Sequence, residues 1–261
     1  RYSAVSLSSQ KSYLSDELEL VAKTFRRFGK DHIEHHAEEV HRKDLDVPEE
    51  IIVGLAQMGC FGLSIPEEYG GSASGSIKDM YGMVIATEEL SRASLSIGGS
   101  LITRPEILAR AIENGGTDEQ KRTLLPKIAS GDLMSAVAVT EPDHGSDVAS
   151  ITMTARPEPS GGWKLNGVKT WCTFAGRADL LMVLARTNPD TSQGHRGLSV
   201  FVVGKERADG HSFDFQQDSG GRMQGKAIPT LGYRGMHSFE IAFQDWVVPE
   251  DSLIGGIEGE G

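Results

Sequence analysis

The spacing of apolar residues changes near residue 131 of this 261-residue chain. Before that point, apolar residues recur at helical spacing, which is typical of amphipathic helices. After it, short apolar runs are separated by turn residues, which is typical of strands. The sequence therefore predicts an α+β chain, with an α-helical domain over residues 1–131 and an antiparallel β-sandwich or barrel over residues 132–261.

Four segments of the first half carry helix signals. Ser15 is a suitable N-cap for a first helix, and Pro48 is expected to be the first residue of a second. Thr117 and Gln120 have the spacing of a capping box at the start of the fourth. The apolar face of the first helix is expected to consist of Leu14, Leu18, Val21, Phe25 and Phe28, and that of the second of Ile51, Ile52, Leu55 and Met58. A third helix is expected over Ile77–Leu90, with an apolar face of Met80, Met83, Val84 and Leu90.

The second half contains short apolar runs that predict strands. Asn166-Gly167 lies between two of these runs and is typical of a type I′ hairpin turn. The predicted strands are Met134–Val139, Ile151–Ala155, Trp163–Leu165, Val168–Cys172, Leu180–Ala185, Leu198–Val203 and Phe239–Val248.

The charge balance restricts the partners of the chain. With 37 acidic and 26 basic residues, the net charge of −11 disfavours nucleic-acid binding. No apolar run reaches the roughly 18–20 residues that cross a bilayer, and the first residues lack the apolar segment of a signal peptide. Cys60 and Cys172 have the spacing of neither a disulfide framework nor a metal site. We expect a cytoplasmic protein, or one of the mitochondrial matrix if the source is eukaryotic, without nucleic-acid or membrane partners.

The stretch AVAVTEPDHGSD at residues 136–147 combines an apolar strand with a polar loop. The loop offers the hydroxyl of Thr140, then Gly145, where a backbone can approach a ligand closely, and Ser146. These groups suit a phosphate or the polar edge of a ring. A well-capped surface turn has the same composition, so the residues alone leave both interpretations open.

This stretch resembles the T-E-P-x-x-G-S-D signature of the acyl-CoA dehydrogenase family. Lys169–Ala175 (KTWCTFA) follows about 25 residues later and is similar to the K-x-W-I-T element of the same family. Further blocks occur in the family's order along nearly the whole chain: Ile65–Gly71, Glu88–Arg92, Gly116–Leu125, Gly197–Phe201, Leu231–Glu240 and Val248–Gly255.

The resemblance implies a helical domain followed by a β-domain that binds FAD and acyl-CoA, with a C-terminal helical domain absent from this chain. The cofactor-binding residues that it implies are Val137, Val139, Thr140, Gly145, Ser146, Trp171 and Thr173. The first three line the flavin ring, and Gly145 and Ser146 approach the phosphates and the CoA arm of the substrate. Trp171 lies against the isoalloxazine, and Thr173 hydrogen-bonds the cofactor. The alternative interpretation of Trp171 is a core aromatic residue in a strand.

In this family the α-proton is removed by a glutamate of the C-terminal domain, which we expect beyond Gly261. No catalytic residue is therefore assigned in this chain, and Glu141 belongs to the cofactor loop. LGYRGMHSF and the segment Thr103–Gly116, which is longer than the usual connection there, resemble the branch that oxidises (2S)-methylsuccinyl-CoA to mesaconyl-CoA. The carboxylate of such a substrate needs a cationic or multi-donor partner, and the candidates are Arg92, Arg104 and His144.

Other functions of the same fold stay open. They are dehydrogenation of glutaryl-CoA or isovaleryl-CoA, flavin-dependent monooxygenation, and a non-catalytic partner role. His144 stands where the family usually has a small residue. Its imidazole either contacts a polar acyl group of the substrate or points to solvent. The resemblance also implies an electron-transferring flavoprotein as electron acceptor and a homo-oligomer, a tetramer or a dimer.

Overall fold

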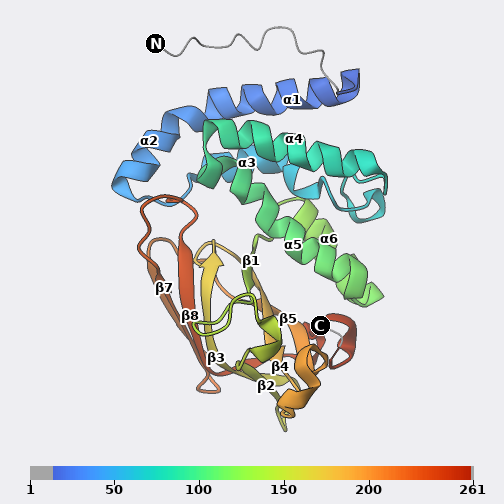
Figure 1. Cartoon of the computed structure of the whole chain (residues 1–261), viewed down its shortest axis with the longest axis vertical. Coiled ribbons are helices and arrows are strands. Elements are labelled where there is room, and N and C mark those ends of the chain that lie inside the picture. The colour runs from blue at the N-terminus through green and yellow to red at the C-terminus, as the bar shows by residue number, and fades with distance from the viewer. Residues whose placement is uncertain (1–13, 260–261) are drawn as a thin grey trace.

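A computed structural model describes residues 14–259, with helices at one end of the molecule and a curled sheet at the other (Figure 1). The expectations for residues 1–13 and for the region after Gly261 lie outside this range. The helices are α1 (Asp16–Phe28), α2 (Glu34–Lys43), α3 (Glu49–Gln57), α4 (Ile77–Ala93), α5 (Ser100–Gly115) and α6 (Asp118–Ala129). The strands are β1 (Ser135–Ala138), β2 (Thr154–Pro157), β3 (Trp163–Thr173), β4 (Leu180–Arg186), β5 (Leu198–Gly204), β6 (Ser212–Gln216), β7 (Arg222–Ala227) and β8 (Ser238–Val248).

The helix starts follow the sequence signals closely. The side chain of Ser15 accepts a hydrogen bond from the first turn of α1, and Thr117 and Gln120 form the predicted capping box of α6. Helix α1 packs along α4, where Arg26 reaches the buried Glu89 at 2.6 Å (Figure 1). Each cap satisfies backbone amides that a helix start leaves without partners.

Several expectations about the helical half are wrong. Pro48 is the N-cap of α3 rather than its first residue, because the helix begins at Glu49. Met80 and Val84 are exposed, since α4 turns a different stripe toward the core. The segment Thr103–Gly116, expected to be a long connection, lies almost entirely in helix α5. Helix α2 was missed because its sequence, EHHAEEVHRK, contains one large apolar residue and therefore has no apolar stripe.

The strands of the described residues form one sheet in the order β1-β4-β2-β3-β8-β7-β6, and β5 pairs with β4. Most neighbours are antiparallel, whereas β1 runs parallel to β4. The structure confirms the runs predicted at Met134–Val139, Leu180–Ala185, Leu198–Val203 and Phe239–Val248 to within one residue at each end. The run Ile151–Ala155 overlaps β2 only in its last two residues, and β6 and β7 were missed because they are short and rich in polar residues.

The hairpin predicted at Asn166-Gly167 is wrong. Both residues lie inside β3, at a shift in its register with β8. The side chain of Asn166 exchanges hydrogen bonds with Asp245 of β8, and a Cβ on Gly167 would lie 2.8 Å from Met153. The pair therefore forms a β-bulge, in which glycine is needed for close packing. The turn between β2 and β3 lies earlier, at residues 158–162.

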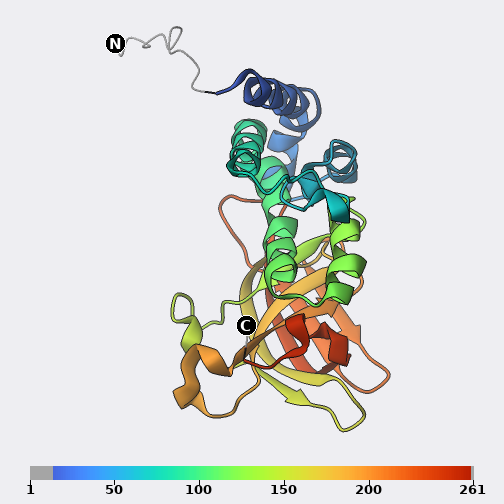
Figure 2. The same cartoon turned by 90° about the vertical axis from the view of Figure 1, so that its right-hand side faces the viewer.

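The two halves share a continuous apolar core. Leu108 of α5 and Leu125 of α6 are buried in one cluster with Leu180 of β4 and Val202 of β5. In the view of Figure 2, α5 and α6 extend from the helical end down to the sheet. The helices and the sheet are therefore held together by buried apolar surface, which makes their mutual placement part of the fold. Among the described residues, no helix is long and apolar enough to span a membrane.

Candidate functional site

The structure brings the loop after β1 against the C-terminal part of β3. The amide of Thr170 donates a hydrogen bond to the carbonyl oxygen of Thr140 at 2.8 Å. The two segments, 30 residues apart in sequence, are the ones in which the candidate residues are concentrated. Val137 and Val139 alternate with the fully buried Ala136 and Ala138, so the valines present a partly exposed face.

A buried ion pair fixes this contact. The Nζ of Lys169 lies 2.9 Å from Oε1 of Glu141 and 2.8 Å from the carbonyl oxygen of Val139. Glu141 also accepts hydrogen bonds from the amides of Thr152 and Met153 and from the Thr152 hydroxyl. Burial opposes ionisation of Glu141, but these donors outweigh it and lower the pKa of the carboxyl group. Glu141 is therefore a structural anion and a poor proton acceptor.

Trp171 is not a core residue. Its side chain is 57% exposed and its φ of 59° lies in the left-handed region, which a large side chain rarely adopts. The register of β3 and β8 shifts between Lys169 and Cys172, so Trp171 occupies a bulge that turns the indole outward. Thr173, two residues on, is buried, and its hydroxyl lies 2.9 Å from that of Ser238. The strand thus presents one exposed aromatic face beside an ordered polar pair.

The distal part of the loop is open. Backbone hydrogen bonds in both directions between Glu141 and His144 close a tight turn. Gly145 and Ser146 are exposed beyond it, and a Cβ on Gly145 would meet no atom within 4 Å. The side chain of His144 is partly exposed and makes no hydrogen bond or ion pair within residues 14–259. No contact within residues 14–259 therefore requires glycine at position 145.

A hollow of about 340 Å³ lies beside this loop, and sequence reasoning missed it. Arg156 and Arg186 line it, and the guanidinium groups donate to backbone carbonyl oxygens such as those of Thr187 and Ala149. In the part of the chain that the structure describes, the hydrogen bonds of both guanidinium groups go to backbone carbonyl oxygens, and no carboxylate pairs with either arginine. The hollow is therefore locally positive in a chain of net charge −11. No sequence signal marked these arginines, because both belong to ordinary strands.

The three candidates for a substrate carboxylate are in different environments. Arg92 is exposed and its ion pairs, with Glu88 and Glu89, stay on α4. Arg104 of α5 is partly buried, and its Nε is buried without a hydrogen-bond partner in the described structure. Burial raises the pKa of Tyr233, whose hydroxyl contacts that of Ser100, while the Arg104 charge and hydrogen bond oppose the shift. Among the three candidates, Arg104 is thus the one with a buried hydrogen-bond donor, its Nε, that has no partner in the described structure.

The two cysteines are free and buried, and burial raises the pKa of each thiol to about 12. A thiol with such a pKa is almost entirely protonated near neutral pH, so neither residue is a competent nucleophile. Cys172 directly follows Trp171 and serves as packing under the bulge.

Comparisons with known proteins agree with the motifs. Residues 15–132 match the model of the acyl-CoA dehydrogenase N-terminal domain, and residues 136–246 match that of the middle domain of the same family. The chain is 42% identical to (2S)-methylsuccinyl-CoA dehydrogenase of Cereibacter sphaeroides, over 96% of this chain and 44% of that protein. The chain thus spans less than half the length of this curated relative.

Solved structures give the same result for the fold. A glutaryl-coenzyme A dehydrogenase in complex with glutaryl-CoA superposes with a TM-score of 0.81 and 30% identity, over 97% of this chain and 59% of that one. The FAD complex of PigA superposes with a TM-score of 0.78 and 28% identity, over 97% of this chain and 61% of that one.

Proposed function

The chain belongs to the acyl-CoA dehydrogenase family, and on this basis we propose that the protein catalyses FAD-dependent α,β-dehydrogenation of a short acyl-CoA, (2S)-methylsuccinyl-CoA to mesaconyl-CoA. The 42% identity to a (2S)-methylsuccinyl-CoA dehydrogenase supports this substrate. The observation that carries the proposal is the contact of the loop after β1 with the bulge of β3 that exposes Trp171. Dehydrogenation of glutaryl-CoA is the second candidate, supported by the 30% identical structural neighbour.

The exposed indole fits a flat aromatic cofactor. Trp171 has a φ that large side chains rarely adopt, and such positions cluster at functional sites; its exposed indole offers a flat face on which an aromatic ring can stack. The residues proposed to hold FAD are Val137, Val139, Thr140, Gly145, Ser146, Trp171 and Thr173. When bound, FAD supplies the acceptor for the hydride that leaves the β-carbon of the substrate. The protein's part is to orient the ring and to keep water from its face.

The CoA arm is proposed to pass the exposed Gly145 and Ser146. The open space at Gly145 leaves the loop backbone accessible, and the adjacent hollow lined by Arg156 and Arg186 is positive. Phosphate groups on the arm would offset charges that no carboxylate of the described chain pairs with. His144, at the turn of the loop, is proposed to face the acyl end or solvent.

Arg104 is proposed to bind the free carboxylate of the acyl group. A buried Nε–H donor without a partner is costly, and a carboxylate ligand would accept its hydrogen bond. Arg92 already has two carboxylate partners on its own helix and is the weaker candidate. Glu141 has its carboxylate committed to Lys169 and Thr152, so the group that removes the α-proton is proposed to be a glutamate outside the described residues.

The test is bleaching of the flavin absorbance under anaerobic conditions. We expect (2S)-methylsuccinyl-CoA to bleach the flavin of the purified holoenzyme faster than glutaryl-CoA or isovaleryl-CoA, and electron-transferring flavoprotein to restore the absorbance. Arg104→Gln is expected to raise KM for the dicarboxylic substrate more than for butyryl-CoA, and Arg92→Gln is the matched control. If no acyl-CoA bleaches the flavin, a monooxygenase or non-catalytic role replaces the proposal. Sedimentation of the same sample tests the expected dimer or tetramer.

A further inference from the structure

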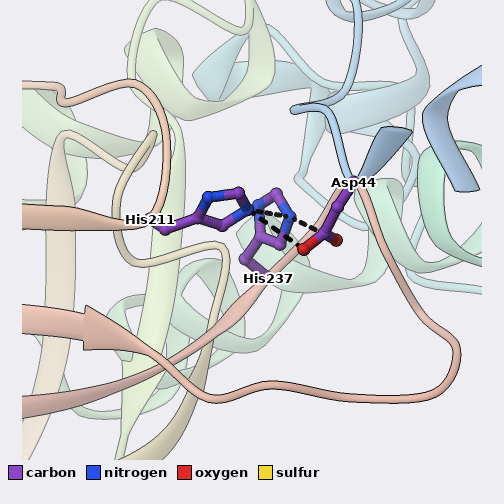
Figure 3. Close-up of side chains that lie close together, drawn as sticks. All are labelled: Asp44, His211 and His237. Carbon is purple, nitrogen blue, oxygen red and sulfur yellow. Dashed lines mark hydrogen bonds and ion pairs between the residues drawn. The ribbon is translucent and has the colours of Figure 1, made fainter. Parts of the chain in front are cut away.

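Three side chains converge on one point between the helical end and the sheet (Figure 3). The Nε2 atoms of His211 and His237 are 3.1 Å apart. One carboxylate oxygen of Asp44 lies 3.2 Å from Nε2 of His237, and the other lies 3.3 Å from Nε2 of His211. Each residue thus directs one potential ligand atom toward the same small volume.

The cluster depends on tertiary structure. Asp44 follows α2 at its C-cap and has a left-handed φ of 54°, whereas His211 directly precedes β6 and His237 directly precedes β8. Its members lie far apart in sequence, so the cluster has no motif of closely spaced ligands. Since Asp44 comes from the helical half and both histidines come from the β half, a ligand bound here would join the two.

Asp46 orients the most buried member of the cluster. The Nδ1 of His237 lies 3.1 Å from Oδ1 of Asp46, whose other oxygen accepts the amide of Gly210 at 2.6 Å. A carboxylate on Nδ1 favours the tautomer that carries the proton there and leaves the Nε2 lone pair directed at Asp44 and His211. Carboxylate–histidine–metal arrangements in proteins have this form.

We propose that Asp44, His211 and His237 bind a divalent transition metal ion, with zinc as the best match to the ligand set. Two atoms that are each about 2.0–2.1 Å from a tetrahedral zinc ion lie about 3.3 Å from one another. The 3.1 Å between the two Nε2 atoms is close to one edge of that tetrahedron, and Asp44 places Oδ1 at 3.2 Å from His237 and Oδ2 at 3.3 Å from His211, so either oxygen can be the third ligand. Imidazole nitrogen disfavours calcium and magnesium, which prefer oxygen ligands.

The surroundings allow a fourth ligand from solvent. The side chains of His211 and Asp44 are 51% and 41% exposed, so water can complete the tetrahedron. The charges facing the cluster are the carboxylates of Asp44 and Asp46, the guanidinium of Arg234, whose Nε lies 3.5 Å from Asp44, and the guanidinium of Arg177, whose charge acts on Asp46.

The metal would also support the bulge of β3. The carbonyl oxygen of His237 accepts a hydrogen bond from the amide of Phe174 at 2.8 Å, three residues after Trp171. Fixing His237 to the loop after α2 therefore restrains the strand segment that follows the exposed indole. This consequence is independent of which acyl-CoA the protein oxidises.

Metal binding is measured on the purified protein after removal of metal with a chelator. Titration with Co²⁺, followed by its visible absorption, is expected to give one equivalent with the intensity of tetrahedral coordination, and Zn²⁺ is expected to displace it. His211→Ala removes one ligand from a half-exposed position and is expected to abolish the tetrahedral spectrum. Asp46→Asn keeps all three ligands and is expected to weaken Zn²⁺ binding by about 10–100-fold.

His195→Ala is the matched control, because His195 is an exposed histidine outside the cluster. It is expected to leave stoichiometry and affinity unchanged. The proposal is overturned if the wild-type protein binds less than one equivalent at saturating metal, or if His211→Ala binds as tightly as the wild type. Circular dichroism of each variant verifies that loss of binding is not loss of folding.

Discussion

The ammonium group of Lys169 and the carboxylate of Glu141 lie 2.9 Å apart and are almost fully buried, with side-chain exposures of 0% and 3%. Lys169 belongs to β3, and Glu141 belongs to the loop after β1. The pair therefore joins the two segments that carry the proposed cofactor residues, and it does so where water cannot compensate for a missing partner.

Replacing Lys169 with Met should be strongly destabilising, because Glu141 would then be a buried carboxylate without its cation. We expect a loss of about 3–5 kcal/mol in the free energy of unfolding, measured by chemical denaturation. The double variant Lys169→Met/Glu141→Gln should recover part of the loss, since its buried polar groups are neutral. Equal stability of the single and double variants would contradict this account of the pair.

Trp171→Gly should separate stability from cofactor binding. Glycine removes the strain of the left-handed φ of 59°, but it also raises the conformational entropy of the unfolded chain. These two effects oppose each other, so the free energy of unfolding should change by no more than about 1 kcal/mol. The flavin content of the purified protein should fall sharply, because the proposed stacking face is lost. A flavin content equal to that of the wild type would argue against the role proposed for Trp171.

Gly145→Ala should leave the fold intact. A Cβ at this position meets no atom of the described residues within 4 Å, and the residue lacks a positive φ, so stability should be unchanged or rise by about 0.4–1 kcal/mol. Affinity for FAD or for the CoA arm should nevertheless fall if a ligand approaches the backbone here. Isothermal titration calorimetry with FAD and with the acyl-CoA measures both affinities. Affinities equal to those of the wild type would indicate that neither ligand approaches the loop at this position.

Gly167→Ala is the contrasting glycine substitution. Its φ is 145° and a Cβ would lie 2.8 Å from atoms of Met153, so the substitution overpacks the bulge. We expect a loss of about 1–3 kcal/mol in the free energy of unfolding. A hairpin turn at Asn166-Gly167 would instead tolerate the change with little effect on the packing around Met153, and thermal unfolding of the two glycine variants makes the comparison.

Protonation of His237 should stabilise the metal-free protein at low pH. Burial lowers the pKa of this imidazole, but its hydrogen bonds to Asp46 and Asp44 outweigh burial and raise the pKa above the ordinary value of 6.5. The contribution is therefore complete below about pH 6.5 and is lost as the pH rises through the raised pKa. In the presence of a chelator, His237→Gln should destabilise the protein more at pH 6 than at pH 9.

The other groups facing His237 allow a clean measurement. Asp44, Asp46, Arg234 and His211 lie around His237, and the comparison is best made in the His211→Ala background, which removes the second imidazole of the cluster. NMR titration of the His237 imidazole gives its pKa directly. A value below 6.5 in the metal-free protein would show that burial outweighs the two aspartates.

Much of the fold was readable from local patterns. The helix starts at Ser15 and Thr117 follow from capping residues, and the long apolar runs become β4, β5 and β8. Local patterns failed where the tertiary setting decides the outcome. Asn166-Gly167 has the composition of a turn but forms a bulge, because β3 continues past it in register with β8. A polar helix such as α2 has no periodic signal, since its contacts are supplied by the surrounding structure.

The sequence by itself determined the helical and β halves and the motifs that mark the family, because apolar periodicity and short motifs are encoded by neighbouring residues. Only the tertiary structure decided which distant groups meet. It buries Lys169 against Glu141, turns Trp171 outward at a bulge and brings Asp44 to His211 and His237. These contacts depend on strand register, left-handed backbone positions and the packing of the helices on the sheet, none of which a local pattern encodes.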